Sequence, residues 1–325
     1  MDALTEKQLI DVRTSGWFAE FVQRTDEKEV TAGALAEFLM NLRRTNLVPQ
    51  FFFGKPPSVL DVGTGTGHLS AQIKAVIEEM NGEGVDYNGI EYDPRFAAQT
   101  QRKIRGGVVM PGDGFASAEN VLDSLQMGDK PDMIVGSHSF MYSPDLAKSV
   151  ENIRDLMKPS SIAIFVNLSP DADTVTVTKG FAQDMGAETD AIMVRNFRIL
   201  QMPTQTIKFR ARMYFPEVSE ELWQELREAK PYDDKNNPHA AHKDGLVVRK
   251  MVEFVLQRPL EALGQDDRNA YLGGIQKKLR VQGNALYLDN IVEVAVSPNS
   301  DKQTKRAVEL AATATSRNLE KQMTI

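Results

Sequence analysis

Three glycines at alternate positions suggest where this chain holds a ligand. Gly63, Gly65 and Gly67 come directly after the apolar run 58–62 and directly before a helical pattern. Glycine permits left-handed backbone conformations and lets a ligand approach the main chain closely. The first turn of the following helix adds unpaired N–H groups and the positive end of a helix dipole. This pattern predicts a cofactor-binding turn between a first strand and a helix.

Three interpretations of this turn compete. The dinucleotide fingerprint G-x-G-x-x-G/A requires a small residue at position 68, where this chain has His68. The spacing G-x-G-x-G, preceded by Asp61, instead resembles motif I of the class I S-adenosylmethionine (SAM) methyltransferases. A tight strand–helix turn without a ligand is the third interpretation. The spacing of acids farther along the chain is the next test.

Acids stand where the second and third predicted strands end. Glu91 closes the predicted strand 86–91 at the distance from the glycines, roughly 20 residues or somewhat more, at which a ribose-binding acid is expected. A carboxylate there can accept from both ribose hydroxyls, and Asp93 is a competing candidate. Asp113 follows the third predicted strand, as a ligand-binding acid or as part of an ordinary Gly-Asp-Gly turn. The glycine turn and the acids are spaced as one fold requires. Their agreement is stronger evidence for a cofactor site than any one of these features alone.

The elements that would position these residues alternate along the chain. Five short apolar runs are typical of strands, and four helical patterns lie between them. The predicted strands are 58–62, 86–91, 106–111, 132–137 and 161–168. Successive β–α units predict a parallel sheet with helices on both faces, and right-handed crossovers make it doubly wound.

The remaining segments predict additions to this core. The first fifty residues are helical in pattern, 206–215 alternates like a strand, and 285–296 is one more long strand. A charged helical stretch from about 219 to 280 is interrupted by the loop 231–245. The predicted parts are an N-terminal helical lid (1–50), a SAM-binding core (51–170), the C-terminal part of the sheet with a substrate-region insertion (171–300) and a polar tail (301–325). The polar end of the chain carries one weakly amphipathic helix, which either frays or docks on a partner.

The segment 58–168 resembles the SAM-binding core of class I methyltransferases on these motifs. GWFAEFVQRTDEKEVTAGALAEFL, SHSFMYSPDLAKSVENIRDLMKPSSIAIFV and ALYLDNIVEVAV resemble, more narrowly, segments of histamine N-methyltransferase and its relatives. The resemblance implies an α/β fold with a mostly parallel, seven-stranded, doubly wound sheet, a substrate lid formed by the N-terminal helices and a late insertion, and SAM as the cofactor. The cofactor-binding residues that it implies are Asp61, Gly63, Gly65, Gly67, Glu91, Asp113 (near the adenine amino group) and Ser137.

The same resemblance implies residues around a methyl acceptor. Trp17 and Phe21 match aromatic positions that cover the substrate, and Glu29 (or Glu27) matches the acid that binds a substrate amine. Asp289 matches a polar position on the last strand, although this chain has LDN where the family carries amides. The plainer alternative is that aromatic residues at helical spacing belong to the core.

The resemblance also places His138 and Tyr142 after the fourth strand, facing the reacting atom. SAM carries its methyl group on a sulfonium, so the protein must mainly align the acceptor with the S–CH3 bond and exclude water. Orientation of this kind contributes on the order of 7–11 kcal/mol. An amine acceptor must be neutral, and His138 could take or relay its proton, or could merely pack at the strand end. Tyr142, with an ordinary pKa of about 10, is a pocket wall or hydroxyl donor.

Composition argues against several other classes of protein. The 325 residues carry 38 Lys+Arg against 45 Asp+Glu, and the formal charge of −7 disfavours a general nucleic-acid binder. The absence of cysteine removes disulfides and thiolate chemistry. No leader-like start and no apolar run of the ~20 residues that a membrane helix needs are present, so we expect a cytoplasmic protein without membrane contact. His239 and His242 lie in a charged, solvated loop, and no metal is expected.

Missing motifs narrow the prediction further. No Asn/Asp-Pro-Pro-Tyr/Phe follows the fourth strand, which weakens methylation of nucleobases or glutamine amides, and no acid pair supports a divalent-metal mechanism. We therefore predict methyl transfer to a nitrogen or oxygen of a small-molecule acceptor. The alternatives are a non-catalytic SAM-binding protein that acts through partners and an NAD-dependent oxidoreductase, which His68 disfavours. Neither the acceptor nor the oligomeric state follows from the sequence.

Overall fold

The chain forms two compact units. The computed structural model describes residues 21–48, 55–82, 84–139, 143, 145–179, 204–228, 245–256 and 259–323. The first unit takes its residues from Met1–Glu27, Leu168–Thr189 and Arg210–Ile291. The second takes its residues from Lys28–Asn167, Asp190–Phe209 and Val292–Ile325. It contains the glycine turn and the acids Asp61, Glu91, Asp93 and Asp113.

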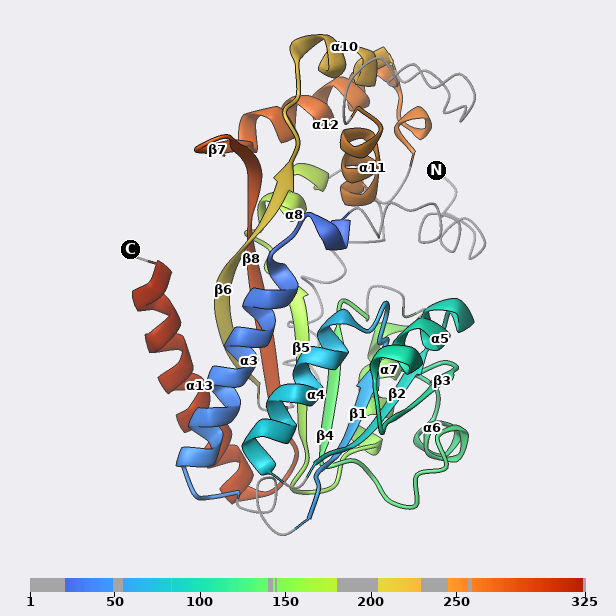
Figure 1. The fold of residues 1–325 in the computed structure, drawn as a ribbon, viewed down its shortest axis with the longest axis vertical. Coiled ribbons are helices and arrows are strands. Elements are labelled where there is room, and N and C mark those ends of the chain that lie inside the picture. Colours follow the sequence, from blue (N-terminus) through green and yellow to red (C-terminus); the bar gives the residue numbers. More distant parts are fainter. Residues whose placement is uncertain are drawn as a thin grey trace. The chain divides into compact units, whose positions relative to one another are not determined.

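The sheet has the predicted doubly wound topology, with strand order β3-β2-β1-β4-β5-β8-β6 (Figure 1). The strands on this path are β1 (Ser58–Val62), β2 (Asp86–Glu91), β3 (Val108–Pro111), β4 (Met133–Ser137), β5 (Ile162–Leu168), β6 (Gln205–Phe215) and β8 (Ala285–Pro298). The pairs β1/β2, β1/β4, β2/β3 and β4/β5 are all parallel. The prediction of a mostly parallel sheet with seven strands on its main path is therefore confirmed. An eighth strand, β7 (Arg280–Gln282), pairs with β8 in antiparallel fashion.

Helices follow the strands of the second unit in the predicted order. They are α3 (Glu27–Arg44), α4 (His68–Asn81), α5 (Pro94–Lys103), α6 (Ala118–Ser124), α7 (Leu146–Asp155) and α13 (Lys302–Met323). Side-chain caps begin three of them, because Asp93, Ser117 and Asp145 each accept from a backbone N–H of the first turn. One apolar cluster joins Leu60 and Ile134 of the sheet to Val121 of α6 and Val150 of α7. The carboxyl ends of β1, β2 and β4 are thereby held in fixed register.

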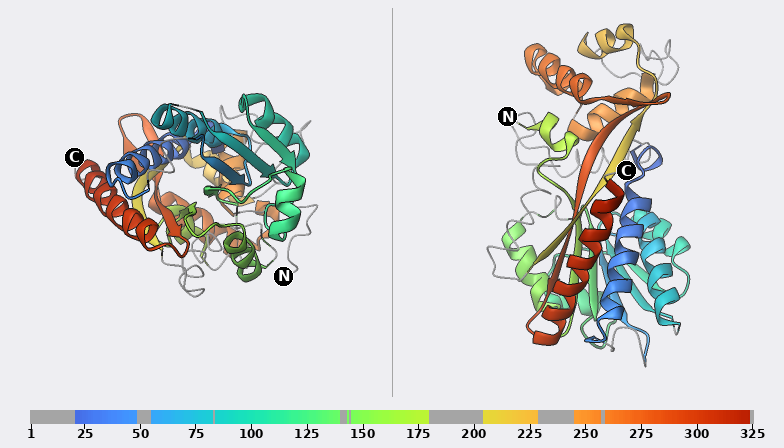
Figure 2. Two further views of the ribbon diagram at one scale, coloured as in Figure 1. Left: turned by 90° about the horizontal axis from the view of Figure 1, so that it is seen from below. Right: turned by 90° about the vertical axis from the view of Figure 1, so that its left-hand side faces the viewer.

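The segment predicted to be a polar tail forms the helix α13, and its inner face is buried. Ala307, Val308, Ala311 and Ala312 are each at most 3% exposed. Figure 2 shows α13 running beside α3, and Thr315 of α13 accepts from Asn41 of α3 at 3.1 Å. Small apolar residues at helical spacing allow this close approach, and they pack the inner face of α13 onto the rest of the second unit.

The first unit has a hydrophobic core of its own. Its elements are α8 (Asp173–Thr178), α10 (Glu220–Glu228), α11 (Gly245–Leu256), the 3-10 turn Leu260–Ala262, α12 (Gln265–Lys278), β7 and the adjoining parts of β6 and β8. The core is built around Trp223, Met251 and Tyr271, all of which are buried. The predicted loop 231–245 lies almost entirely outside the described residues.

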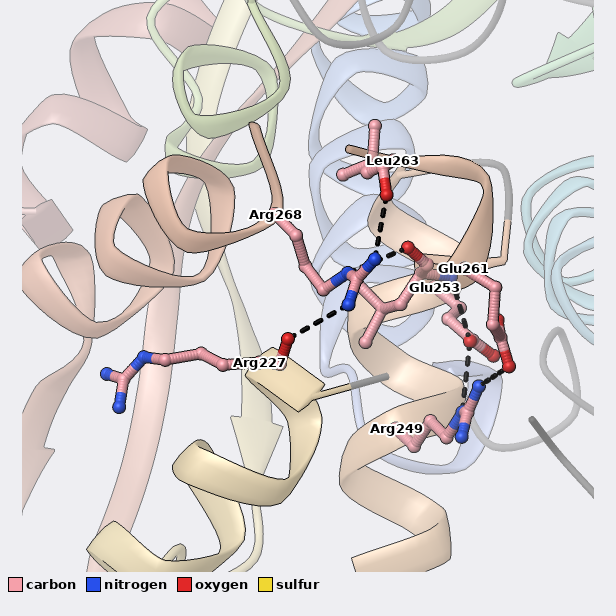
Figure 3. Close-up of polar contacts among 7 residues, drawn as sticks. Arg227, Arg249, Glu253, Glu261, Leu263 and Arg268 are labelled. Carbon is pink, nitrogen blue, oxygen red and sulfur yellow. Dashed lines mark hydrogen bonds and ion pairs between the residues drawn. The ribbon is translucent and has the colours of Figure 1, made fainter. Parts of the chain in front are cut away.

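Buried arginines connect the helices of the first unit. The guanidinium of Arg268 donates to the carbonyl oxygens of Arg227 (2.9 Å), Leu260 (3.1 Å) and Leu263 (2.8 Å) (Figure 3). Arg249, only 1% exposed, pairs with the carboxylate of Glu253 at 3.0 Å. Arginine suits these sites because its planar fork can satisfy several acceptors at once.

Candidate cofactor and active site

The glycine turn is shaped by backbone conformation and by contacts within the protein. Gly63, Gly65 and Gly67 have φ values of 75°, 57° and 73°, all in the left-handed region. A Cβ at Gly63 would lie 2.6 Å from Cβ of Ser139, and one at Gly67 would lie 2.9 Å from Cα of Thr100. The two outer glycines are therefore required by the fold itself. Gly65 lies at the centre of the turn, and its backbone amide donates to the carboxylate of Glu91.

Glu91 connects the end of β2 to the glycine turn. One carboxylate oxygen accepts from the amide of Gly65 at 2.8 Å, and the other accepts from the amide of Asp93 at 3.1 Å. The residue is only 6% exposed. Each carboxylate oxygen can accept more than one hydrogen bond, so Glu91 retains capacity for a ribose hydroxyl beside the turn.

Asp93, the competing candidate for this role, begins α5 instead. Its carboxylate accepts from the amide of Arg95 at 2.9 Å and pairs with the Arg95 guanidinium at 2.8 Å. The hydrogen bond from Arg95 lowers the pKa of Asp93 despite partial burial. Asp93 is thus occupied as a helix cap, and the geometry favours Glu91.

Asp61 is buried within the sheet and contacts two hydroxyls. One carboxylate oxygen accepts from Ser70 Oγ at 2.5 Å and from Tyr87 OH at 2.6 Å. Burial raises the pKa of Asp61 to about 6, against the opposing effect of these hydrogen bonds. Burial likewise raises the pKa of Tyr87 well above its ordinary value. Asp61 therefore joins β1 to α4 and β2 and supports the turn from behind. Ser70 and Tyr87 were not identified from the sequence, because only strand register brings them together.

Asp113 lies in an exposed turn after β3. Its carboxylate accepts from the amide of Phe115 at 2.9 Å. A Cβ at the neighbouring Gly114 would lie 2.6 Å from Val62 and 2.7 Å from Ile90, both near strand ends. The glycine is explained by this close packing, and it places the Asp113 turn against the carboxyl ends of β1 and β2.

The end of β4 places polar side chains beside the glycine turn. Ser137 Oγ accepts from Nζ of Lys28, a buried residue of α3, at 3.3 Å. His138 is half-buried, has a left-handed φ of 51°, and donates its backbone N–H to Val166 O at 2.9 Å. Non-glycine residues in this conformation are uncommon and cluster at functional sites. Lys28 was not identified from the sequence, because its hydrogen-bond acceptor Ser137 lies 109 positions farther along the chain.

Two buried hydroxyls at this site have no hydrogen-bond partner among the described residues. They belong to Thr64, inside the glycine turn, and to Ser139, directly after His138. Buried polar groups are normally paired, so such groups call for an explanation. Polar atoms of a ligand held between the turn and the end of β4 would supply the missing partners. This observation agrees with a cofactor that carries hydroxyl, amino and carboxylate groups.

The residues predicted to surround the acceptor are distributed over both units. Glu29, in the second unit, pairs with His68 Nε2 at 3.2 Å, and both side chains are partly exposed. In the first unit, Phe21 is 9% exposed and stacks on Phe254 at a centroid distance of 4.4 Å. Core packing thus accounts for Phe21 without a substrate. Trp17 and Tyr142 lie outside the described residues.

Asp289, the last of the predicted acceptor residues, lies in an ion network of the first unit. It pairs with Arg280 and, at 3.5 Å, with Arg210. Its backbone N–H donates to Asp173 at 3.0 Å, while its other carboxylate oxygen is buried without a hydrogen-bond partner in the described part of the chain. These ion pairs account for an acid at position 289, and a role of Asp289 in substrate binding stays a prediction.

A metal centre is not found in the parts of the chain that the structure describes: no three His, Cys, Asp or Glu side chains gather there as metal ligands. His239 and His242 fall outside those parts. None of the described helices is long and apolar enough to cross a membrane.

The topology and the glycine turn with its ribose-type acid define a class I SAM-dependent methyltransferase. The family described as "Methyltransferase domain" matches residues 34–239, more than half of the chain. The chain therefore belongs to the methyltransferase domain family, and its cofactor is SAM. The narrower likeness to histamine N-methyltransferase is not established by this match.

Solved structures match the chain only distantly. The YcgJ protein from Bacillus subtilis is 12% identical, with 81% of this chain and 99% of that chain covered and a TM-score of 0.43. A SAM-dependent methyltransferase from Aquifex aeolicus is 15% identical, with coverage of 50% and 81% and a TM-score of 0.35. The methyltransferase CalH in complex with S-adenosylhomocysteine is 20% identical, with coverage of 42% and 36% and a TM-score of 0.32. No curated protein matches the chain.

Proposed function

We propose that this enzyme transfers the methyl group of SAM to a nitrogen or oxygen of a small-molecule acceptor. The observation that carries the proposal is the contact of Glu91 with the Gly65 amide, which holds an acid and a glycine turn together at the carboxyl ends of parallel strands. Ligands of open α/β sheets bind at these ends. The net charge of −7 and the sequence after β4 favour a small molecule over nucleic acid.

The residues of the second unit divide the work of cofactor binding. Glu91 would accept from the ribose hydroxyls of SAM, and the amides of the glycine turn would hold its amino-acid part. Asp113 would contact the adenine, and Ser137 would contact the methionine part. Asp61 acts indirectly, because its partners Ser70 and Tyr87 fix the strand and the helix on either side of the turn.

When bound, SAM supplies an activated methyl group on a sulfonium. The protein then has to align the acceptor and exclude water, and orientation is worth on the order of 7–11 kcal/mol. His138 lies at the end of β4, where its left-handed backbone directs the side chain independently of the strand's alternation. We assign it to orienting the acceptor, with proton relay as the second possibility.

The test is to measure binding and turnover separately. Calorimetric titration with S-adenosylhomocysteine should show binding to one site, and a panel of amines and phenols should yield S-adenosylhomocysteine from SAM. If the protein binds but no acceptor in a broad panel is methylated, a non-catalytic SAM-binding role is favoured. If it binds neither SAM nor S-adenosylhomocysteine, the cofactor assignment is wrong.

A further inference from the structure

A buried lysine beside the glycine turn has no role in the assignments so far. Lys28 lies in the first turn of α3 and is 9% exposed. Its Nζ donates to Oγ of Ser137, the last residue of β4, at 3.3 Å. Lysine is rarely buried unless an anion or strong acceptors compensate its charge. The position of this cation, at the carboxyl ends of the central strands, therefore needs a reason.

The charges of the surrounding groups give part of that reason. Lys28 is close enough to Asp61 to oppose the rise in the pKa of Asp61 that burial causes, whereas Glu91 adds to that rise. Asp61 itself is bound by Ser70 and Tyr87 rather than by the lysine. The ammonium of Lys28 instead donates to Ser137, two residues before Ser139, whose buried hydroxyl has no hydrogen-bond partner among the described residues.

SAM presents one anionic group and two cationic groups to such a site. The acids Glu91 and Asp113 suit its hydroxyl and cationic groups, and its amino-acid carboxylate needs a positive partner. Lys103 also contacts the turn, but it donates to the carbonyl of Thr66 at 2.6 Å from an exposed position on α5. Lys28, by contrast, is a buried cation at the carboxyl end of β4.

We infer that Lys28 binds the carboxylate of the amino-acid part of the cofactor, with Ser137 as the group that orients its ammonium. The inference rests on the SAM-binding role proposed for this site. A compact ammonium with three donors can bond Ser137 and a carboxylate at the same time. The neighbouring pair Glu29–His68, at 3.2 Å, attaches the same turn of α3 to the residue after Gly67. Lys28 is thereby held between β4 and the glycine turn.

Two ligands that differ only at the amino-acid end provide the test. S-adenosylhomocysteine carries the carboxylate, whereas 5′-methylthioadenosine has the same adenosine and thioether without it. Lys28→Gln should weaken S-adenosylhomocysteine by roughly 10- to 100-fold, as expected for one charged hydrogen-bonded partner. It should change the affinity for 5′-methylthioadenosine by no more than about twofold. Lys28→Arg should recover most of the loss, because the charge is retained.

Lys74 provides a matched control on α4. It is also 9% exposed, and it pairs with Glu78 at 2.5 Å. Lys74→Gln should leave the affinities for both ligands unchanged. If Lys28→Gln lowers the affinity for both ligands equally, the inference is overturned and the lysine is purely structural. Unchanged affinity for both ligands would overturn the inference as well. If the unmodified protein binds neither ligand, the cofactor site itself has been misassigned.

Discussion

The assignment of Glu91 rather than Asp93 as the ribose-binding acid can be tested by changing each residue alone. The two carboxylates are separated by one residue and have different jobs in the structure. Glu91 accepts from the amides of Gly65 and Asp93, whereas Asp93 accepts from Arg95 and begins α5. Glu91→Gln keeps the shape of the side chain and replaces one acceptor oxygen by an NH2 donor. Asp93→Ala removes the cap.

The expected magnitudes differ in kind. Hydrogen bonds to a charged acceptor contribute about 1.5–3 kcal/mol, so Glu91→Gln should weaken S-adenosylhomocysteine roughly 10- to 100-fold. If the glutamine NH2 faces a backbone N–H, an acceptor is lost; if it faces a ribose hydroxyl, it can only donate to that hydroxyl, and in both arrangements the charge that strengthens the bond is gone. Asp93→Ala should cost about 1 kcal/mol of folding stability. For a chain of 325 residues that lowers the melting temperature by about 1–2 °C.

Calorimetric titration and thermal unfolding on the same two proteins would separate these effects. We expect an affinity loss with Glu91→Gln and a stability loss with Asp93→Ala. Because Glu91 also holds the Gly65 amide, the folded state of Glu91→Gln must be checked by its melting temperature before titration. The reasoning is refuted if Glu91→Gln binds within twofold of the unmodified protein, or if Asp93→Ala loses as much affinity as Glu91→Gln.

Three further predictions concern the rest of the described chain. Asparagine also tolerates the left-handed backbone of residue 138 (φ 51°), so the His138→Asn protein should fold normally and keep most of its turnover. A fall in kcat of ~10²-fold, together with a flattened acidic limb of the pH–rate profile, would instead show that His138 moves a proton. The folded-state pKa of Asp61, about 6, lies above its unfolded value, so folding takes up a proton and the free energy of unfolding falls as pH rises from about 4 to about 6. Asp61→Asn should remove about 3 kcal/mol of this pH dependence, measured by urea unfolding. Identical pH curves for the two proteins would contradict the prediction. Arg268→Ala leaves three carbonyl oxygens without their donor (Figure 3). Urea unfolding should show a loss of about 3 kcal/mol in the stability of the first unit. A loss under about 1 kcal/mol would mean that water replaces the guanidinium.

The sequence was sufficient for the sheet core and for the location of the cofactor turn. Apolar runs bounded by glycines and charged helical segments encode β1 to β5 locally, because side-chain alternation and helical spacing are short-range properties. The left-handed glycines 63, 65 and 67 were equally visible, since only a residue without Cβ adopts that conformation easily. The sequence also indicated one weakly amphipathic helix in the polar C-terminal segment, but not where it packs, because the alanines of α13 are weak hydrophobic signals until α3 lies beside them.

The tertiary structure decided which of the chemically plausible residues face one another. The choice between Glu91 and Asp93 depends on where the Gly65 amide points, and the partners of Asp61 depend on the register of β1 against β2. The place of Lys28 next to Ser137 could not be read from the sequence, since the two residues are separated by 109 positions. Such contacts are set by the packing of whole elements, and residue type and local spacing carry no information about them. The sequence thus determined the class of fold and the kind of cofactor, while the packing of α3 and β4 determined that Lys28 meets Ser137 at the carboxyl end of β4.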